Sequence, residues 1–163
     1  MANWADQGKQ YAAFVEAELK AEYDRRASVN SRAAGALTAS TGLVTLVLGV
    51  FAVLVGKDFV LTGHARGALA VALGSLLLAA ACAVIAALPW KSTVPSPEYL
   101  QSLIDDHWQV SEVAARNITS NSNVGVIRRL RSGTDIKFKF LIASSAFQLA
   151  ATGALVLCTL LVV

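Results

Sequence analysis

The acidic residues around His107 are the strongest candidates for metal chemistry in this chain. Asp105 and Asp106 precede it, and Glu112 follows five residues later. Imidazole and carboxylate groups bind zinc, but a site needs several ligands that converge. We therefore favour a solvated position on a helix. The other histidine, His64, lies in a predicted loop, where it could sense pH, although we favour an interface position.

A cluster of basic residues offers a second kind of chemistry. It consists of Arg128, Arg129, Arg131, Lys137 and Lys139. This basic cluster could hold a phosphate or nucleotide, but basic segments beside membranes also fix topology and meet anionic lipid headgroups, which is the interpretation we favour. No Gly-rich phosphate loop, metal-ligand spacing or catalytic set accompanies it. We expect no enzyme, no cofactor and no nucleic-acid partner.

Four of the five hydroxyl and amide side chains in the last apolar stretch fall close together: Ser144, Ser145, Gln148 and Thr152. An amide inside a membrane needs a hydrogen-bond partner, so we expect Gln148 at a contact between helices. The alternative is a pore, in which several copies contribute these side chains to a polar ring. Both cysteines, Cys82 and Cys158, also lie in apolar stretches, where we expect buried thiols.

Three uncharged stretches must position all of these groups. They are residues 33–56, 67–90 and 140–163, in a chain of 163 residues that is 55% hydrophobic. Each has 24 residues, which as a helix reaches about 36 Å and so crosses a hydrocarbon core of about 30 Å. The sequence predicts an all-α membrane protein with three transmembrane helices, the first two forming a hairpin over residues 33–90.

The placement of Lys and Arg predicts the orientation. Residues 1–32 and 91–139 together hold twelve of these residues, whereas the loop between the first two spans holds Lys57 and Arg66 alone. The positive-inside rule then puts the N-terminus in the cytoplasm and the C-terminus outside.

The two basic segments are predicted to be long cytoplasmic helical extensions. Residues 1–32 form an amphipathic helix, and because no proline intervenes, one helix from about residue 10 to residue 56 is expected. In residues 91–139, Ser96 is a predicted N-cap before Pro97. The polar run 117–123 weakens the helical pattern, and we expect a hinge at Ser132 and Gly133 with Asp135 as a fresh cap.

Glycines recur every seven residues in the first span, at Gly35, Gly42, Gly49 and Gly56. Seven residues are nearly two helical turns, so these glycines share one face, which another helix can approach closely. The partner is either the second span or another subunit, and the sequence leaves both open. Three further glycines are expected at helix contacts: Gly67, Gly74 and Gly153.

Two local patterns resemble a known family. One is the Arg-rich helix that continues into a small-residue span, residues 25–37, and the other is the basic helix that continues into the last span, residues 130–141. Together they resemble small bacterial membrane proteins of the Pycsar-type transmembrane effector family. The resemblance implies a helical inner-membrane effector that assembles and impairs the membrane when a cyclic nucleotide appears. No separate nucleotide-binding domain is visible, so sensing would belong to the cytoplasmic segments.

The sequence thus predicts a non-enzymatic, self-assembling membrane protein, with a defence-type effector as its most specific form. The partners expected are the lipid bilayer and a second copy or another membrane subunit, and the family resemblance implies a cyclic nucleotide as a further partner. An accessory or scaffold subunit of a larger membrane complex is the alternative, followed by a small constitutive channel.

Overall fold

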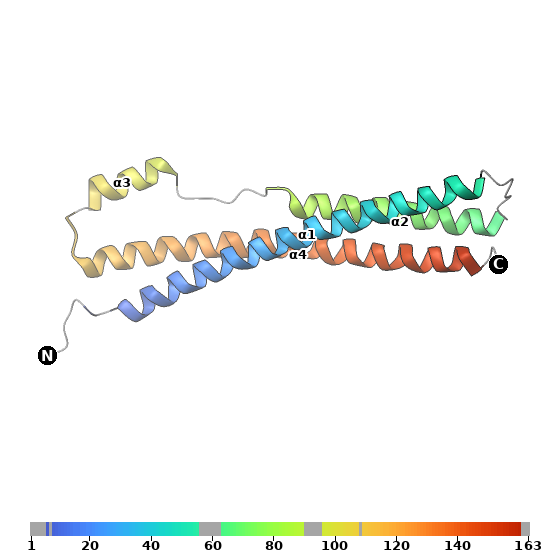
Figure 1. Ribbon diagram of the computed structural model, residues 1–163. Coiled ribbons are helices and arrows are strands. Elements are labelled where there is room, and N and C mark those ends of the chain that lie inside the picture. Colours follow the sequence, from blue (N-terminus) through green and yellow to red (C-terminus); the bar gives the residue numbers. More distant parts are fainter. Residues whose placement is uncertain (1–5, 7, 56–62, 90–95, 108, 161–163) are drawn as a thin grey trace. The chain divides into compact units, whose positions relative to one another are not determined.

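The computed structural model describes residues 6, 8–55, 63–89, 96–107 and 109–160. Within these residues the chain is all-helical (Figure 1), with helices α1 (Lys9–Val55), α2 (Gly63–Ala87), α3 (Pro97–His107) and α4 (Glu112–Leu160). Of the helices described, α1, α2 and α4 are long and apolar enough to cross a membrane, judged by length and composition. The predicted all-α class and the number of such helices are confirmed.

The long first helix forms as the sequence predicts. It begins at Lys9, directly after Gly8, whose positive φ of 74° suits glycine because that residue has no Cβ. It continues without a break to Val55, so the amphipathic segment and the first apolar stretch belong to one helix. Gly56, the last glycine of the predicted series, lies outside the described residues.

The chain divides into two compact units. Unit 1 comprises Met1–Ser28 and Pro89–Asp135, and unit 2 comprises Val29–Leu88 and Ile136–Val163. Both α1 and α4 contribute residues to each unit.

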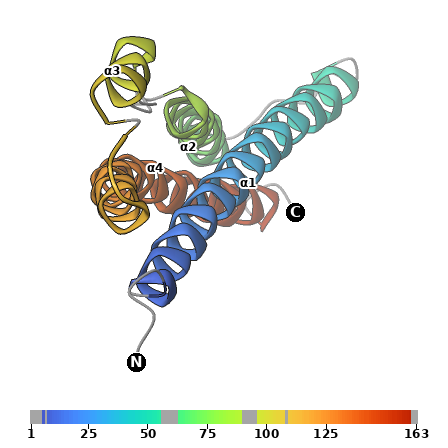
Figure 2. The ribbon, with the colours of Figure 1, turned by 90° about the vertical axis from the view of Figure 1, so that its left-hand side faces the viewer.

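Unit 2 contains parts of the three helices α1, α2 and α4 (Figure 2), and the buried surface of α2 is built mainly from alanine. The buried residues of α2 are Ala65, Ala72, Leu76, Ala79, Ala83 and Ala86. One core cluster joins Val29 and Ala33 of α1, Ala86 of α2 and Leu141 of α4. Alanine lets helix backbones approach closely, which favours packing between membrane helices.

Hydrogen bonds between helices show whether α1, α2 and α4 run parallel or antiparallel to one another in unit 2. Ser144 of α4 donates to the Ala79 carbonyl, and Cys158, further along α4, lies 3.4 Å from the Ala65 carbonyl, earlier in α2. Helices α2 and α4 are therefore antiparallel. Lys137 contacts Asn30 while Gln148 contacts Ser40, so α4 runs parallel to α1.

Unit 1 pairs the first part of α1 with the first part of α4, again in parallel. Arg131 contacts Glu22, and Asp135 contacts Arg25. Ser96 accepts a hydrogen bond from the Tyr99 amide at 3.2 Å, which is the predicted N-cap of α3. A second cap escaped prediction: the Ser111 hydroxyl accepts from the Ala114 amide at 3.3 Å and begins α4.

Two expectations about helix ends are wrong. No hinge occurs at Ser132 and Gly133, and Asp135 caps nothing, because α4 is continuous from Glu112 to Leu160. In the polar run 117–123, the side chains support the helix: Thr119 donates to the Ala115 carbonyl, and Asn121 donates to Asn117 one turn earlier.

The predicted loop between the first two spans also ends too late. Helix α2 begins at Gly63, so His64 and Arg66 belong to its first turn.

Candidate functional site

The residues considered for metal chemistry do not converge. In the part of the chain that the structure describes, no group of three or more His, Cys, Asp or Glu side chains could hold a metal ion. His107 is exposed, and Asp105 accepts hydrogen bonds from Gln101 one turn earlier. His64 is exposed as well.

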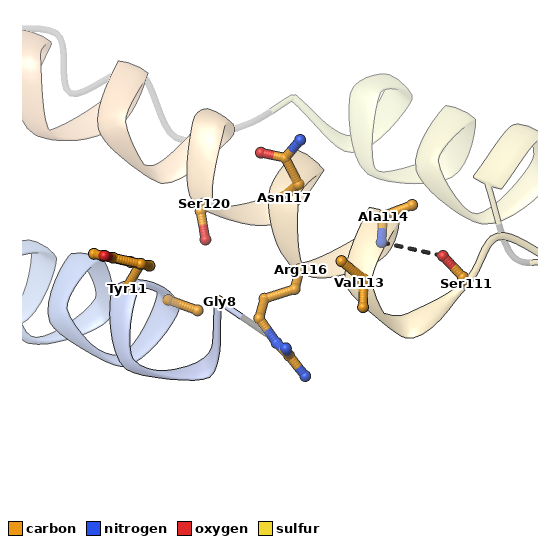
Figure 3. Close-up of a pocket in the computed structure, with 9 residues that line it drawn as sticks. Gly8, Tyr11, Ser111, Val113, Ala114, Arg116, Asn117 and Ser120 are labelled. Atoms are coloured by element: carbon orange, nitrogen blue, oxygen red, sulfur yellow. Dashed lines mark hydrogen bonds between the residues drawn. The ribbon is translucent and has the colours of Figure 1, made fainter. Parts of the chain in front are cut away.

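A cavity of about 440 Å³ lies in unit 1 between the beginnings of α1 and α4 (Figure 3). Tyr11 of α1 and Gly8, which directly precedes that helix, line one side, while Arg116, Asn117 and Ser120 line it from α4. Its one guanidinium, on Arg116, already forms an ion pair with Glu112. Because that charge is engaged, the cavity offers hydroxyl and amide groups around a mostly apolar wall.

The structure divides the predicted basic cluster by role. Arg128, Arg129 and Lys139 are exposed, whereas Arg131 forms ion pairs and Lys137 is 1% exposed. The Lys137 ammonium donates to the Asn30 amide oxygen at 2.8 Å. Lys137 therefore faces the helix contact of unit 2, and the five residues do not form one surface patch.

Arg131 belongs to a group of charges that joins α1 to α4 in unit 1. This charged cluster consists of Glu18, Glu22, Arg25, Arg131 and Asp135. The Arg131 guanidinium lies 2.6 Å from Glu22 and 2.9 Å from Glu18, and the Arg25 guanidinium lies 2.8 Å from Asp135 and 3.7 Å from Glu22. The hydrogen bond from Arg131 to Glu22 and the nearby negative charges raise the pKa of Arg131, which stays cationic.

Glu22 is the buried member of the charged cluster. Its side chain is 7% exposed, whereas the other four are between 39% and 56% exposed. A buried carboxylate is costly unless it is paired, so Arg131 and Arg25 compensate it. Glu22 was not singled out from the sequence. The heptad spacing of Val15, Glu22 and Val29 places Glu22 on the packing face of α1 and could have revealed its role.

Of the four polar residues considered for a helix contact or a pore, two make contacts between helices, and Gln148, which was expected at such a contact, is one of them. The Gln148 amide nitrogen donates to the Ala36 carbonyl and to the Ser40 hydroxyl, both at 2.9 Å, and Ser144 donates to the Ala79 carbonyl at 2.8 Å. Ser145 and Thr152 are exposed and donate to carbonyls of their own helix. The partner Ser40 is fully buried and was not singled out from the sequence.

The glycines of the first span point away from the other helices of unit 2. Gly35, Gly42 and Gly49 are exposed, and a Cβ added at any of them would meet nothing within 4 Å. The residues of α1 that pack inside the unit include Ala33, Ala36 and Ser40. At 100° per residue, the glycines lie about 150° from this packing side. The described residues thus give no intramolecular partner for the glycine series.

Two threonines complete this face of α1. This face has residues at alternating spacings of three and four, and we call it the outward face of α1. It consists of Gly35, Thr38, Gly42, Thr45 and Gly49. Thr38 donates to the Ala34 carbonyl and Thr45 to the Thr41 carbonyl, so both hydroxyls are satisfied within the helix. The outward face is therefore small, exposed and free of unpaired hydroxyl donors.

The remaining predicted glycine positions are also open. Gly67 and Gly153 are exposed and Gly74 is half-buried, and a Cβ at each would meet nothing within 4 Å. In the described residues, these three glycines make no close helix contact.

The fold and these contacts define an all-helical protein with three helices suited by length and composition to cross a membrane. The chain matches no protein-family model, and no curated protein or solved structure is significantly similar to it.

Proposed function

We propose that this chain is a non-enzymatic membrane protein that assembles with further copies of itself through the outward face of α1. The observation that carries this proposal is the exposure of Gly35, Gly42 and Gly49 on the side of α1 opposite its packing residues. Glycine destabilises a helix by about 1 kcal/mol relative to alanine in water. A repeated glycine face is useful in a bilayer because it lets a second helix approach the backbone closely.

The spacing of the outward face suits a particular crossing. Positions that alternate by three and four residues follow the 3.5-residue period of a left-handed pair of helices. Since copies in one membrane share one orientation, two α1 helices would pair in parallel, with each glycine opposite its counterpart.

In this proposal α1, α2 and α4 span the inner membrane of a bacterium. The charge asymmetry puts the N-terminus and residues 91–139 in the cytoplasm and the C-terminus outside. Exposed Arg128, Arg129 and Lys139 are then available to anionic groups from lipid or from a cyclic nucleotide. The most specific form of the proposal is a defence-type effector that impairs the membrane after a cytoplasmic signal, and it rests on the family resemblance.

Substitution of two glycines tests the assembly. Gly42→Leu with Gly49→Leu adds bulk to the outward face while keeping it hydrophobic, so the chain still inserts but the oligomer dissociates to monomers. Oligomer mass is measured by light scattering in mild detergent. The matched control is Ala70→Leu with Ala81→Leu, two exposed positions on α2. An oligomer that survives the glycine substitutions, or that the control disrupts equally, contradicts the proposed contact.

Membrane permeability tests the effector form. Expression in bacteria should produce growth arrest and dye leakage that depend on a cytoplasmic trigger, and the Gly42→Leu, Gly49→Leu variant should lose both. Steady ion conductance in liposomes without a trigger would instead indicate a constitutive channel.

An accessory or scaffold subunit is the alternative, and α3 favours it. This helix has no buried residue, and the apolar side chains Tyr99, Leu100 and Ile104 are between 40% and 51% exposed. Such a face is typical of a helix that packs against another protein. Absence of leakage together with stable co-purification of a second membrane protein would support this function over the effector.

A further inference from the structure

The two helices that pair in unit 1 need a feature that fixes their relative position along their axes. Few large apolar side chains are buried between them: Ile127 and Leu130 of α4 are buried, while Val15 and Leu19 of α1 are half-buried. Parallel helices with such a limited apolar contact can slip by one turn, about 5.4 Å, and form similar contacts again.

The charged cluster distinguishes between these arrangements. In the observed pairing, Arg131 lies between Glu18 and Glu22, one turn apart on α1, and Asp135 lies against Arg25. The paired residues differ by 109 to 113 in sequence, as two parallel helices in one register require.

A slip by one turn in either direction brings like charges together. If α4 moves so that Asp135 takes the place of Arg131, a third carboxylate faces Glu18 and buried Glu22. If it moves the other way, Ile127 faces Glu22 and Arg131 faces Arg25. The first slip places negative charges side by side, and the second leaves a buried carboxylate opposite an apolar side chain while two guanidinium groups repel.

We infer that the charged cluster fixes the register of α1 against α4 in unit 1, with Arg131 as the positioning residue. Arg131 suits this role because one planar guanidinium reaches two carboxylates at once. A single ion pair between Arg131 and one glutamate could form again after a slip, because Glu18 and Glu22 lie one turn apart. The ion pair between Asp135 and Arg25 excludes that slip. Buried polar and ionic groups have this registering role in some coiled coils, where they select one alignment among several.

Distances between spin labels on the full chain test this inference. Labels at Ala27→Cys and Gly125→Cys, both exposed, are separated along the helix axes by about eleven residues or 16 Å. A slip of one turn changes that axial component by about 5 Å, a difference that pulsed electron–electron double resonance resolves. The native thiols are replaced in this background by Cys82→Ala and Cys158→Ser. Excess unlabelled protein removes distances between copies, so the result does not depend on the proposed self-assembly.

The expected result is one narrow distance distribution for the native charged cluster. Arg131→Gln should broaden it or add a second maximum, whereas Arg131→Lys, which keeps the charge, should preserve the original maximum. The matched control is Arg129→Gln, which removes the same charge from an exposed residue two positions before Arg131 and should change nothing.

A merely stabilising role would give a different pattern. If Arg131→Gln lowers the melting temperature but keeps the narrow native distribution, the inference is wrong. It is also wrong if Arg129→Gln broadens the distribution equally. Asp135→Asn provides a milder variant should Arg131→Gln fail to fold. It removes the native ion pair with Arg25 and also the repulsion that opposes one slip, so it should broaden the distribution most toward that slip.

Discussion

Gln148→Leu is the substitution whose cost the structure defines most closely. The Gln148 amide nitrogen donates to the Ala36 carbonyl and to the Ser40 hydroxyl, both at 2.9 Å. Leucine has a similar volume but no donor, so the substitution removes two hydrogen bonds between α4 and α1. The Ser40 hydroxyl keeps its own bond to the Ala36 carbonyl, so neither acceptor on α1 loses its last partner.

With α1 and α4 in a membrane, as proposed, the expected loss follows from the energy of hydrogen bonds between membrane helices. Each contributes about 0.6 kcal/mol on average, so Gln148→Leu should reduce the free energy of unfolding by about 1 kcal/mol. Ser40→Ala should cost about half as much, because Gln148 still reaches the Ala36 carbonyl. The two substitutions share one hydrogen bond, so their combined cost should fall short of the sum by about 0.6 kcal/mol.

Unfolding of the full chain in mixed micelles, followed by circular dichroism, measures these values. Thr152→Val is the matched control because Thr152 is exposed and donates only to carbonyls of its own helix. It should change the free energy of unfolding by less than about 0.5 kcal/mol. A Gln148→Leu variant as stable as the native chain, or strict additivity with Ser40→Ala, would refute the assigned contact.

The remaining predictions concern a buried lysine and the start of α3. In the same unfolding assay, Lys137→Met should cost less than about 1 kcal/mol, whereas Asn30→Leu should cost about 1–2 kcal/mol. The difference arises because only Asn30→Leu leaves the buried Lys137 ammonium without its amide partner. A larger cost for Lys137→Met than for Asn30→Leu would contradict this account. The backbone N–H of Glu98 and the Ser96 hydroxyl lower the pKa of the Glu98 carboxyl, so its contribution to the stability of α3 is present above the ordinary value of 4.5 and is lost as pH falls through the lower pKa. Ser96→Ala should therefore raise the pKa of Glu98 toward its ordinary value in an NMR titration, and should speed amide exchange at Tyr99; an unchanged titration would exclude the cap as a cause.

The helices could be predicted from the sequence because their signals are local. Charge-free stretches of 24 residues and the lack of proline before the first of them define α1, and Ser96 with Pro97 defines the start of α3. The continuity of α4 could not be predicted in the same way. Its polar run 117–123 has low intrinsic helix propensity, but side-chain bonds such as Thr119 to the Ala115 carbonyl support the helix there.

The candidate sites were harder to predict because they depend on which helix faces which. Arg131 and Lys137 look like members of one basic cluster in the sequence, yet Arg131 meets Glu22 from a segment more than 100 residues away and Lys137 is buried beside Asn30. Helical periodicity gives the face on which a residue lies but neither its partner helix nor its register. Both require the parallel pairing of α1 with α4.

The position of the glycines illustrates how facing direction alters a functional argument. A seven-residue glycine repeat in a hairpin can serve simply to pack its two helices together, and then it implies nothing about assembly. In unit 2 the close packing instead uses alanines of α2 and the Ala33, Ala36 and Ser40 side of α1. The glycines occupy the opposite side, where a Cβ at Gly35, Gly42 or Gly49 would meet nothing within 4 Å. A repeat that internal packing does not use is better explained by a contact with another molecule. The glycine substitutions, unlike those at Gln148, should therefore abolish the proposed self-assembly without unfolding the chain.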